Sequence, residues 1–522
     1  MSVFHYQKNG GQICECQYKI LILPFFLMEL KSLSTSASKE LLQEVIPFWF
    51  KHGVDNQNGG FICGLSHTGN VVDASKYSWY QGRGAWIFAK IYERTKNQEH
   101  LDIARKALDF VKKHCIHTDT KNNQETTFYT IVGRDGAQLK ERSTFDKVGY
   151  ASMFYAEGMQ QVAIHETIET RTEMLVTVQQ LLSNFLSNCN NKLRNAPEPA
   201  YLLSKPYQKG TRTLGHQMIP LRLATQVLTN HAKILTEKQS MFFETVAKEM
   251  VHNITVHFFD KDTRLTREEL TYDFTPLNDP VLYYLGHAIE AYWFVMAEGC
   301  RLQNRTLVEL ACDRIQKHIE CAWDPVFGGL NRGMSLCNNG KSSGSNNVSP
   351  LEINDKQLMD KVAWVEQEGL VALLMVRERS ERKEMQEWAT IWYEKLHIWV
   401  HQHFPLKKYG YDLWLVGGDR KATFEENYTF GNAGLKSRKE NYHHPRYLMC
   451  VVEEYERKTK QKKDDKNDDE DDGQKKEKSP TLLIFMLFVM VLSVIYDLLF
   501  KVAAGSEGSE SVEDISTNVG EL

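Results

Sequence analysis

Hydrophobic residues recur at helical spacing over most of this chain. From Ser38, a good N-cap, apolar residues lie three and four positions apart until Gly53. Similar stretches follow as far as Glu456, separated by short loops of glycine, asparagine and aspartate. The strict alternation that is typical of strands is scarce. The pattern therefore predicts an all-α body with a few hairpins, at residues 38–456.

The pattern changes after this body. Residues 457–480 are dominated by lysine and aspartate and are too polar to bury a core, so we expect a charged, disordered linker there. Residues 481–500 then form an apolar run with Asp497 as its single charge. A run of about twenty residues is long enough to cross a hydrocarbon core of about 30 Å. We expect a transmembrane helix, followed by a short acidic tail at residues 501–522.

The flanking charges predict the orientation of this span. Lysines precede it, whereas the tail after Lys501 is acidic, so the positive-inside rule places the large domain in the cytosol, as in a tail-anchored protein. The N-terminal extension, residues 1–37, leaves an alternative open. Its apolar run at residues 20–28 belongs either to an extra helix or to a cleaved signal. A cleaved signal would make this a type I membrane protein with a luminal domain.

Composition excludes some classes of function. Of the 522 residues, 42% are apolar, and the formal net charge of −4 gives no electrostatic attraction to nucleic acid. The 10 cysteines include no CxxC pair that would indicate a zinc or redox motif. We interpret these cysteines as reduced thiols.

A short motif occurs twice, beginning at Asp55 and at Asp324. Each copy has a glycine pair after the aspartate, then Lys-x-x-Trp, then a charged residue four positions beyond the tryptophan. Positions i and i+4 share a helix face, so each copy presents an indole beside a charge. These residues are Lys76, Trp79 and Arg83 in one copy, Lys361, Trp364 and Glu368 in the other, and Trp86 extends the first stripe.

One copy alone fits a salt bridge at the edge of a core equally well. Two matched copies favour related helix pairs around a shared axis, with a sugar-stacking platform where their faces meet. A helical toroid built from hairpins is the simplest architecture with this property.

Histidines are the main candidates for chemistry. His287 follows Gly286 near the expected start of a helix, and Glu290 lies on the same face, where it would orient the imidazole or share a substrate proton. The helix dipole disfavours imidazolium at that end and would keep His287 neutral, as a base. A histidine beside a glutamate is often structural, so spacing alone leaves that alternative open.

Two other histidine sites are weaker on spacing alone. His443 and His444 precede Pro445, which fixes the backbone after them. Adjacent histidines point in different directions, which argues against a metal site. His216 precedes Met218 by two residues, and we interpret this segment as a pocket wall.

Residues 55–92 resemble the N-terminal signature of N-acylglucosamine 2-epimerases, and Gln81-Gly82-Arg83 is a specific element of it. The resemblance covers residues 40–456 and implies an (α/α)6 barrel with unlike short-loop and long-loop ends and a site in the axial cleft. Further matches follow in the family's order: Met218-Ile219-Pro220, Gly286-His287 with Glu290 and Trp293, Trp323-Asp324 with Gly328-Gly329, Lys361 with Trp364 and Glu368, and His443 with Pro445-Arg446.

The resemblance also implies a mechanism. In this family two histidines face each other across an opened sugar chain, one removing the C2 proton and the other returning one to the opposite face. By position these are His287 and His443, with Arg83 stabilising the enediolate oxygen and Glu290 orienting His287 or binding a hydroxyl. The residues expected to bind the substrate are Trp79, Trp86, Glu368, Trp364, Met218 and Lys361.

The implied substrates are N-acetylglucosamine and N-acetylmannosamine, converted without a metal or redox cofactor. Animal epimerases respond to ATP, so a nucleotide effector is expected on the resemblance alone. Relatives are often homodimers, although nothing in this sequence marks an interface.

Several positions depart from the family pattern. Leu285 replaces a usual proline, Ala363 and Val365 flank Trp364 where Trp-Trp-Pro is common, and His444 replaces a small apolar residue. The chemical groups remain, so the reaction type transfers better than the substrate. An aldose–ketose isomerase, which returns the proton to C1, and a catalytically silent membrane-tethered binding protein stay open as alternatives. A glycoside hydrolase is less well supported, because it would need two carboxylates across the scissile bond, whereas the strongest candidates here are histidines.

Overall fold

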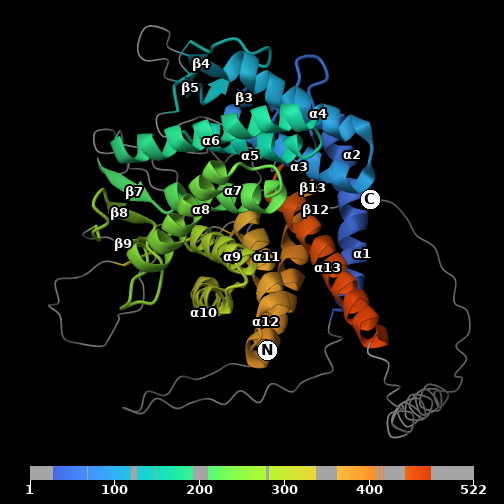
Figure 1. The fold of residues 1–522 in the computed structure, drawn as a ribbon, viewed down its shortest axis with the longest axis vertical. Coiled ribbons are helices and arrows are strands. Elements are labelled where there is room, and N and C mark those ends of the chain that lie inside the picture. The colour runs from blue at the N-terminus through green and yellow to red at the C-terminus, as the bar shows by residue number, and fades with distance from the viewer. Residues whose placement is uncertain are drawn as a thin grey trace, which may run out of the picture. The chain divides into compact units, whose positions relative to one another are not determined.

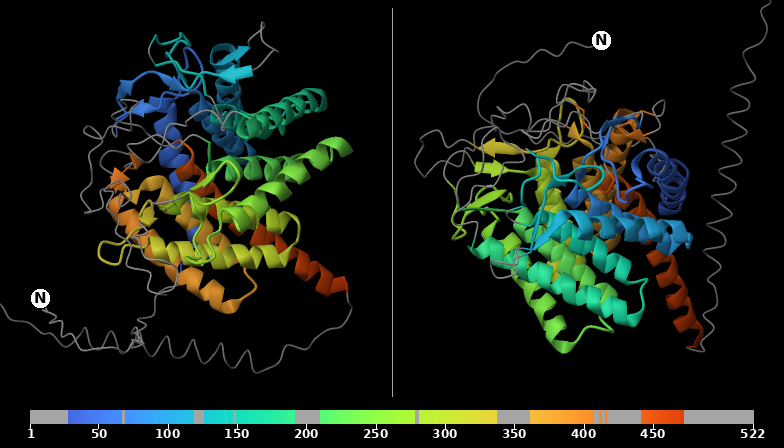
Figure 2. Two further views of the ribbon diagram at one scale, coloured as in Figure 1. Left: turned by 90° about the vertical axis from the view of Figure 1, so that its left-hand side faces the viewer. Right: turned by 90° about the horizontal axis from the view of Figure 1, so that it is seen from above.

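Helices dominate the protein, and its strands are short (Figures 1 and 2). By contacts the chain divides into two units, Met1–Glu456 and Arg457–Leu522. The computed structural model describes residues 28–66, 69–118, 126–140, 142–146, 149–191, 210–277, 281–336, 361–406, 411–412, 415–416 and 441–471.

Six helices of the described chain form an inner set. They are α3 (Ser78–Thr95), α5 (Tyr150–Ala163), α7 (Gly215–His231), α9 (Leu285–Arg301), α11 (Ala363–Arg379) and α13 (His443–Asp471). Every residue of α11 from Ala363 to Val376 is buried, polar side chains included. A helix that buries all of its faces must lie inside a second layer of helices.

The outer set buries one face only. In α4, for example, Leu101, Ala104 and Leu108 are buried at helical spacing while the opposite face is polar. The outer helices are α1 (Leu30–Glu40) with its continuation η1 (Leu41–Val45), α2 (Ile46–Phe48) and η2 (Trp49–Gly53), then α4 (Gln98–Phe110) with η3 (Val111–Cys115), α6 (Ile168–Asn191), α8 (Glu237–His252) with η4 (Asn253–His257), α10 (Arg305–Ala322) and α12 (Lys383–His403).

Inner and outer helices alternate along the chain and close into a ring. Each inner helix from α3 to α9 packs against the outer helix that follows it and against the next inner helix, and α11 packs against α12. Helix α11 is bonded to α13 through Gln367 and His444. The last inner helix, α13, returns to α3 through Arg94 and Glu456, whose closest atoms are 2.7 Å apart. Its outer partner is α1, because Glu40 lies 2.8 Å from His444 (Figure 1). This arrangement is an (α/α)6 barrel, and the predicted all-α body is confirmed.

The two ends of the barrel differ, as the resemblance implied. Short turns, such as Lys96-Asn97 between α3 and α4, lead from inner to outer helices. The connections back to the inner helices are longer and carry antiparallel two-stranded sheets. These pairs are β3 (Lys76–Tyr77) with β6 (Ile131–Val132), β7 (Thr211–Thr213) with β8 (Glu269–Thr271), β9 (Val281–Tyr283) with β10 (Met334–Leu336), β11 (Lys361–Val362) with β14 (Leu415–Val416), β1 (Gly64–Leu65) with β2 (Val71–Asp73), β4 (Ile116–Thr118) with β5 (Thr126–Phe128), and β12 (Pro405–Leu406) with β13 (Tyr411–Asp412).

The repeated motif forms the same loop in both copies. In the second copy the backbone N–H of Asp324 donates to the carbonyl of Gly329, and the N–H of Gly328 donates back to Asp324, each over 2.9 Å. Gly328 and Gly329 have φ of 72° and 74°, a region that favours glycine. The first copy repeats these bonds from Asp55.

A third loop of this kind was not predicted. Asp260 bonds to Leu265 and Arg264 over 2.8 Å in the same pattern. Arg264 takes the left-handed conformation, at φ 60°, where the other copies have glycine. This copy could not be recognised in the sequence, because it lacks the glycine pair of the other two.

Two helices extend across predicted domain boundaries. Helix α1 already begins at Leu30, inside the predicted N-terminal extension, and α13 continues through the first part of the predicted linker to Asp471. Within the described residues, no helix combines the length and apolarity that crossing a membrane requires. The predicted span, residues 481–500, lies outside the described residues, as do residues 1–27 and the acidic tail.

Candidate active site

Two predicted histidines meet at a single indole. The ring centroid of Trp364, at the start of α11, lies 5.5 Å from that of His287 and 5.4 Å from that of His443. Both histidines occupy the first turn of their inner helices, at the long-loop end of the barrel. The close approach requires Gly286, because a Cβ there would lie 2.9 Å from Trp364.

The proton of His443 is placed by its partners. Its Nδ1 lies 2.8 Å from Glu368 Oε1, and its Nε2 lies 3.4 Å from Nη1 of Arg83. A guanidinium only donates hydrogen bonds and a carboxylate only accepts them. The arrangement therefore fits a neutral imidazole that carries its proton on Nδ1 and presents the Nε2 lone pair, the form needed in a general base.

Arg446 is a permanent charge behind His443. Its Nη2 donates to Glu290 over 2.7 Å and also to Glu368 Oε1, while Trp293 donates to the other Glu368 oxygen over 2.7 Å. Burial opposes the charged form, but Glu368 and Glu290 outweigh it and raise the pKa of Arg446 well above its ordinary value. Glu368 thus holds Arg446 and His443, both of which are buried.

The predicted role of Glu290 as the partner of His287 is wrong. Glu290 binds Arg446, and the carboxylate beside His287 is Glu268, whose two oxygens each lie 3.1 Å from Nδ1. Backbone bonds to Leu282 and Leu214 hold Glu268 at the start of β8. Helical spacing could not reveal it, because Glu268 lies in a long connection, directly before β8. The Glu268-Glu269 pair was the available signal, and it is unspecific.

The acidic cluster behind His443 is filled by an arginine. Among the described residues, Glu290, Glu368 and His443 form the one group whose ligand atoms all lie within 4.8 Å of one another, a spacing that suits a metal ion. Nη2 of Arg446 bonds to both carboxylates and lies 3.1 Å from His443 Nδ1. The arginine nitrogen therefore occupies the position that a cation would take in this cluster.

Aromatic rings fix the position of Arg83. Its guanidinium carbon lies 4.0 Å from the ring centroid of Phe154, 4.8 Å from that of Tyr442 and 4.9 Å from that of Trp79. Stacking of this kind is favourable for arginine and holds its planar fork in one orientation. Arg83 is partly exposed, so it is positioned without being sealed from solvent.

The remaining apolar candidates lie deeper. Trp86 is buried edge-on against Tyr442, with ring centroids 5.8 Å apart, and Met218 lines a small cavity of about 20 Å³ together with Arg83 and Glu290. That volume holds roughly one water molecule. Both residues therefore form a buried floor around Tyr442 and Arg83.

Buried polar groups complete this floor. The Tyr442 hydroxyl lies 2.8 Å from both oxygens of Glu157, which also accepts a hydrogen bond from Arg222. Burial raises the pKa of Tyr442 far above its ordinary value; the charge of Arg222 opposes this rise and that of Glu157 adds to it. Tyr442 therefore stays protonated and donates a hydrogen bond.

Two predicted candidates bind residues outside this cluster. Lys361 is buried in the second loop motif, where it binds Asp324 over 3.1 Å and Asn331. Lys76 makes the equivalent bond to Asp55 in the first motif, so this lysine stabilises the loop in both copies. His216 accepts a hydrogen bond from the backbone of Thr213 and stacks on a tyrosine ring.

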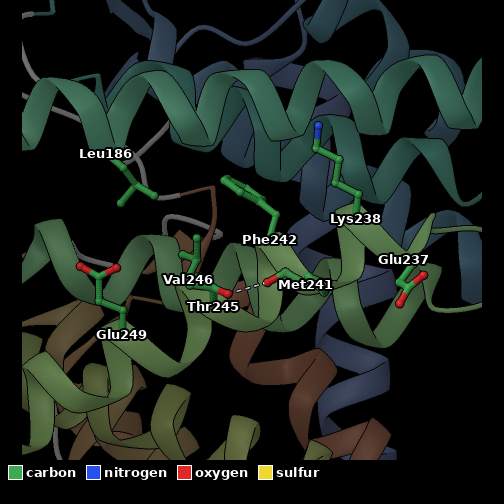
Figure 3. Close-up of a pocket in the computed structure, with 8 residues that line it drawn as sticks. All are labelled: Leu186, Glu237, Lys238, Met241, Phe242, Thr245, Val246 and Glu249. Carbon is green, nitrogen blue, oxygen red and sulfur yellow. Dashed lines mark hydrogen bonds between the residues drawn. The ribbon is translucent and has the colours of Figure 1, made fainter.

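A larger hollow lies elsewhere, between α6 and α8 (Figure 3). It is an open groove of about 530 Å³ that contains neither histidine nor arginine. This groove is therefore separate from the histidine cluster described above. The groove is lined by Leu186, Glu237, Lys238, Met241, Phe242, Thr245, Val246 and Glu249.

Known proteins resemble both the sequence and the fold. N-acylglucosamine 2-epimerase from Mus musculus is 25% identical over 296 residues, 55% of this chain, and the chain spans 65% of that relative's length. Cellobiose 2-epimerase from Bacillus thermoamylovorans B4167 has a TM-score of 0.61 at 18% identity, covering 81% of this chain and 99% of that one. A D-mannose isomerase has a TM-score of 0.59 at 16% identity, covering 82% and 99%.

The family assignment comes from a match to most of the chain. Residues 59–434 match the model of the family described as N-acylglucosamine 2-epimerase (GlcNAc 2-epimerase). The match includes the first loop glycines, Arg83, His287 and Trp364. This protein therefore belongs to the N-acylglucosamine 2-epimerase family.

Proposed function

We propose that this protein is a sugar 2-epimerase that interconverts N-acetylglucosamine and N-acetylmannosamine, with His287 and His443 as its two acid–base groups. One observation carries the proposal: two imidazoles flank a single indole, and each has a carboxylate on Nδ1. Two such groups on opposite sides of a planar intermediate are what inversion at C2 requires.

The chemistry balances without a redox change. The C2 proton is acidic only when the ring is open and C1 is an aldehyde. One imidazole takes this proton on Nε2, and the C–H electrons form a C1–C2 double bond as negative charge moves to the C1 oxygen. The other histidine, as imidazolium, returns a proton to the opposite face of C2. Arg83, beside Nε2 of His443, is suited to stabilise the charged oxygen.

The choice of amino sugar is supported by the family and by the mouse relative. Aldose–ketose isomerisation on the same groups differs only in the carbon that receives the proton, and a D-mannose isomerase shares the fold. The products therefore decide between these two reactions.

The test follows the fate of the C2 proton. The full chain is incubated with N-acetylmannosamine, and separately with mannose, in D2O and followed by proton NMR. Appearance of N-acetylglucosamine with deuterium at C2 is the expected result. Fructose formed from mannose, without amino-sugar turnover, would instead establish the isomerase. If no sugar exchanges its C2 proton, the silent binding protein becomes the better account.

The control separates chemistry from folding. His287→Asn and His443→Asn should each abolish deuterium incorporation while the circular dichroism spectrum is kept. The matched variant His252→Asn changes an exposed histidine on α8 and should leave turnover intact.

We also propose that residues 481–500 attach the barrel to a membrane. Their length and their single charge support this proposal.

A further inference from the structure

We infer that Glu268 is a positioning residue that fixes the tautomer of His287, so that Nε2 carries the lone pair used in proton transfer. This inference rests on the proposed function for its consequence in catalysis. The tautomer itself can be measured without any substrate.

The geometry around His287 leaves one assignment for its Nδ1 proton. Both oxygens of Glu268 lie 3.1 Å from Nδ1, and the Glu268 side chain is only 2% exposed. A buried carboxylate is an acceptor only, so Nδ1 must be the donor. A neutral imidazole with its proton on Nδ1 has its lone pair on Nε2.

Among the described residues, the Glu268 side chain is hydrogen-bonded to His287 alone. Its carboxylate has no other hydrogen-bond partner there, whereas Glu368 is shared by His443, Arg446 and Trp293. The two histidines therefore depend on separate carboxylates. A change at Glu268 should affect the His287 half of the reaction without disturbing the ion pair behind His443.

The charge of Glu268 also matters when His287 accepts a proton. As Nε2 takes the substrate proton, the ring becomes imidazolium, and the adjacent carboxylate stabilises this charge while the Nδ1 proton stays in place. A carboxylate behind a catalytic histidine acts in this way in serine proteases, where its replacement by an amide lowers kcat about 10⁴-fold. No proton needs to pass to Glu268.

The neighbouring residue provides a matched control. Glu269 follows directly, as the first residue of β8. Burial, together with the charge of Glu268, raises the pKa of Glu269 to about 8. Glu269 is thus mainly protonated at neutral pH, and Glu269→Gln replaces one neutral group by another.

The experiment measures the tautomer of His287 and the rate together. The full chain is labelled with ¹⁵N-histidine, and long-range proton–nitrogen spectra, assigned with His287→Asn, report which ring nitrogen is protonated. We expect the proton on Nδ1 in the wild type. In Glu268→Gln the amide can donate to Nδ1, so the proton should move to Nε2. We expect kcat to fall at least about 100-fold while KM changes less than about threefold.

The controls keep the outcomes separate. Glu269→Gln should keep both the Nδ1 tautomer and the rate, and Glu268→Asp should restore part of both. An Nε2-protonated His287 in the wild type would overturn the inference, as would a folded Glu268→Gln with unchanged tautomer and kcat. If Glu268→Gln does not fold, the wild-type tautomer and the Glu268→Asp rate decide. If no sugar is converted, the proposed function fails, but the tautomer measurement still stands.

Discussion

At the scale of single residues, charges in this barrel are placed so that one arginine serves several partners. Arg446 lies between Glu290 and Glu368 and contacts the ring of His443. All three contacts come from Nη2, while the guanidinium plane lies over the rings of Trp293 and Tyr442, an arrangement that a lysine ammonium on a flexible stem does not reproduce. The orientation of His443 therefore depends on a residue that is itself almost completely buried.

Two substitutions of Arg446 test separately the effect of its charge and the effect of its side-chain geometry. Arg446→Lys should fold and lose at least about tenfold in kcat, because the shorter lysine side chain cannot both place a nitrogen at the position of Nη2 and stack on Trp293 and Tyr442. Arg446→Met leaves two buried carboxylates without a counter-charge and should destabilise the protein by about 3–5 kcal/mol. Urea unfolding and initial rates measure both effects.

Arg94→Met is the matched comparison for this prediction. It removes an arginine from the outer side of α3, where Arg94 pairs with Glu456, which is mostly exposed. A pair of this kind contributes about 1 kcal/mol or less. If Arg446→Met were no more destabilising than Arg94→Met, the role assigned to Arg446 would be wrong.

Lys361 should behave as a structural residue. Lys361→Met removes the partner of Asp324 and should lower the free energy of unfolding by about 3–5 kcal/mol, with KM for the sugar unchanged when measured well below the melting temperature. Lys383→Met, at a position 86% exposed, should change stability by less than about 0.5 kcal/mol. A raised KM with normal stability would show instead that Lys361 binds the substrate.

At the scale of elements, three loops with the same backbone hydrogen bonds follow outer helices; they begin at Asp55, Asp260 and Asp324. In each, the residue six positions after the aspartate donates its N–H to a side chain of the barrel: Gln81 in the first, Glu366 in the second and His318 in the third. The backbone pattern is thus kept while its acceptor changes. The Gln81 amide does not titrate, whereas the imidazole of His318 can be protonated by acid.

Acid should loosen the third loop. Burial lowers the pKa of His318 to about 4, so the folded state disfavours the protonated ring. An unfolded histidine titrates near pH 6.5, so the stabilisation is complete above that pH and is lost as the pH falls towards 4. The expected loss is on the order of 3 kcal/mol.

Urea titrations at pH 7 and pH 5 test this prediction. His318→Gln keeps an acceptor for Thr266 but cannot be protonated, so its stability should depend less on pH than that of the wild type. Because burial also lowers the pKa of His231, to about 4, some acid sensitivity should remain. Equal pH dependence in the two proteins would exclude His318 as a source.

The sequence predicts what lies within one helix or one loop. The stripes at Trp79 and Trp364 and the two histidines were found because spacing or family motifs reveal them. The partnership of Glu268 with His287 was missed, since it depends on how β8 packs beside α9. The interaction of Arg446 with Glu290 was missed for the same reason, because the register between helices is set by core packing.

At the scale of the whole molecule, the barrel and the predicted membrane span are separate features. The barrel buries its inner helices in its own hydrophobic core. Attachment should therefore depend on residues 481–500 alone. The full chain should remain with membranes after extraction with alkaline carbonate.

Charges placed in the span test this attachment. Leu487→Lys combined with Val491→Lys should release the protein, since each lysine at the centre of a span costs about 2.5–3.5 kcal/mol. The matched pair Leu487→Ala and Val491→Ala should stay membrane-bound. Release of the unmodified chain by carbonate would refute the predicted span.

The contact between Glu40 and His444 joins the first helix of the ring to the last, across 404 residues. A ribosome that adds about 5–20 residues per second makes these two partners roughly 20–80 s apart. During this interval the nascent chain carries the apolar face of α1 without its final covering, and α11 joins it uncovered only near the end. His443 arrives only with the closing helix, so the candidate site is among the last parts of the barrel to form. Chaperones that shield apolar helices should therefore associate with this chain until synthesis has passed α13.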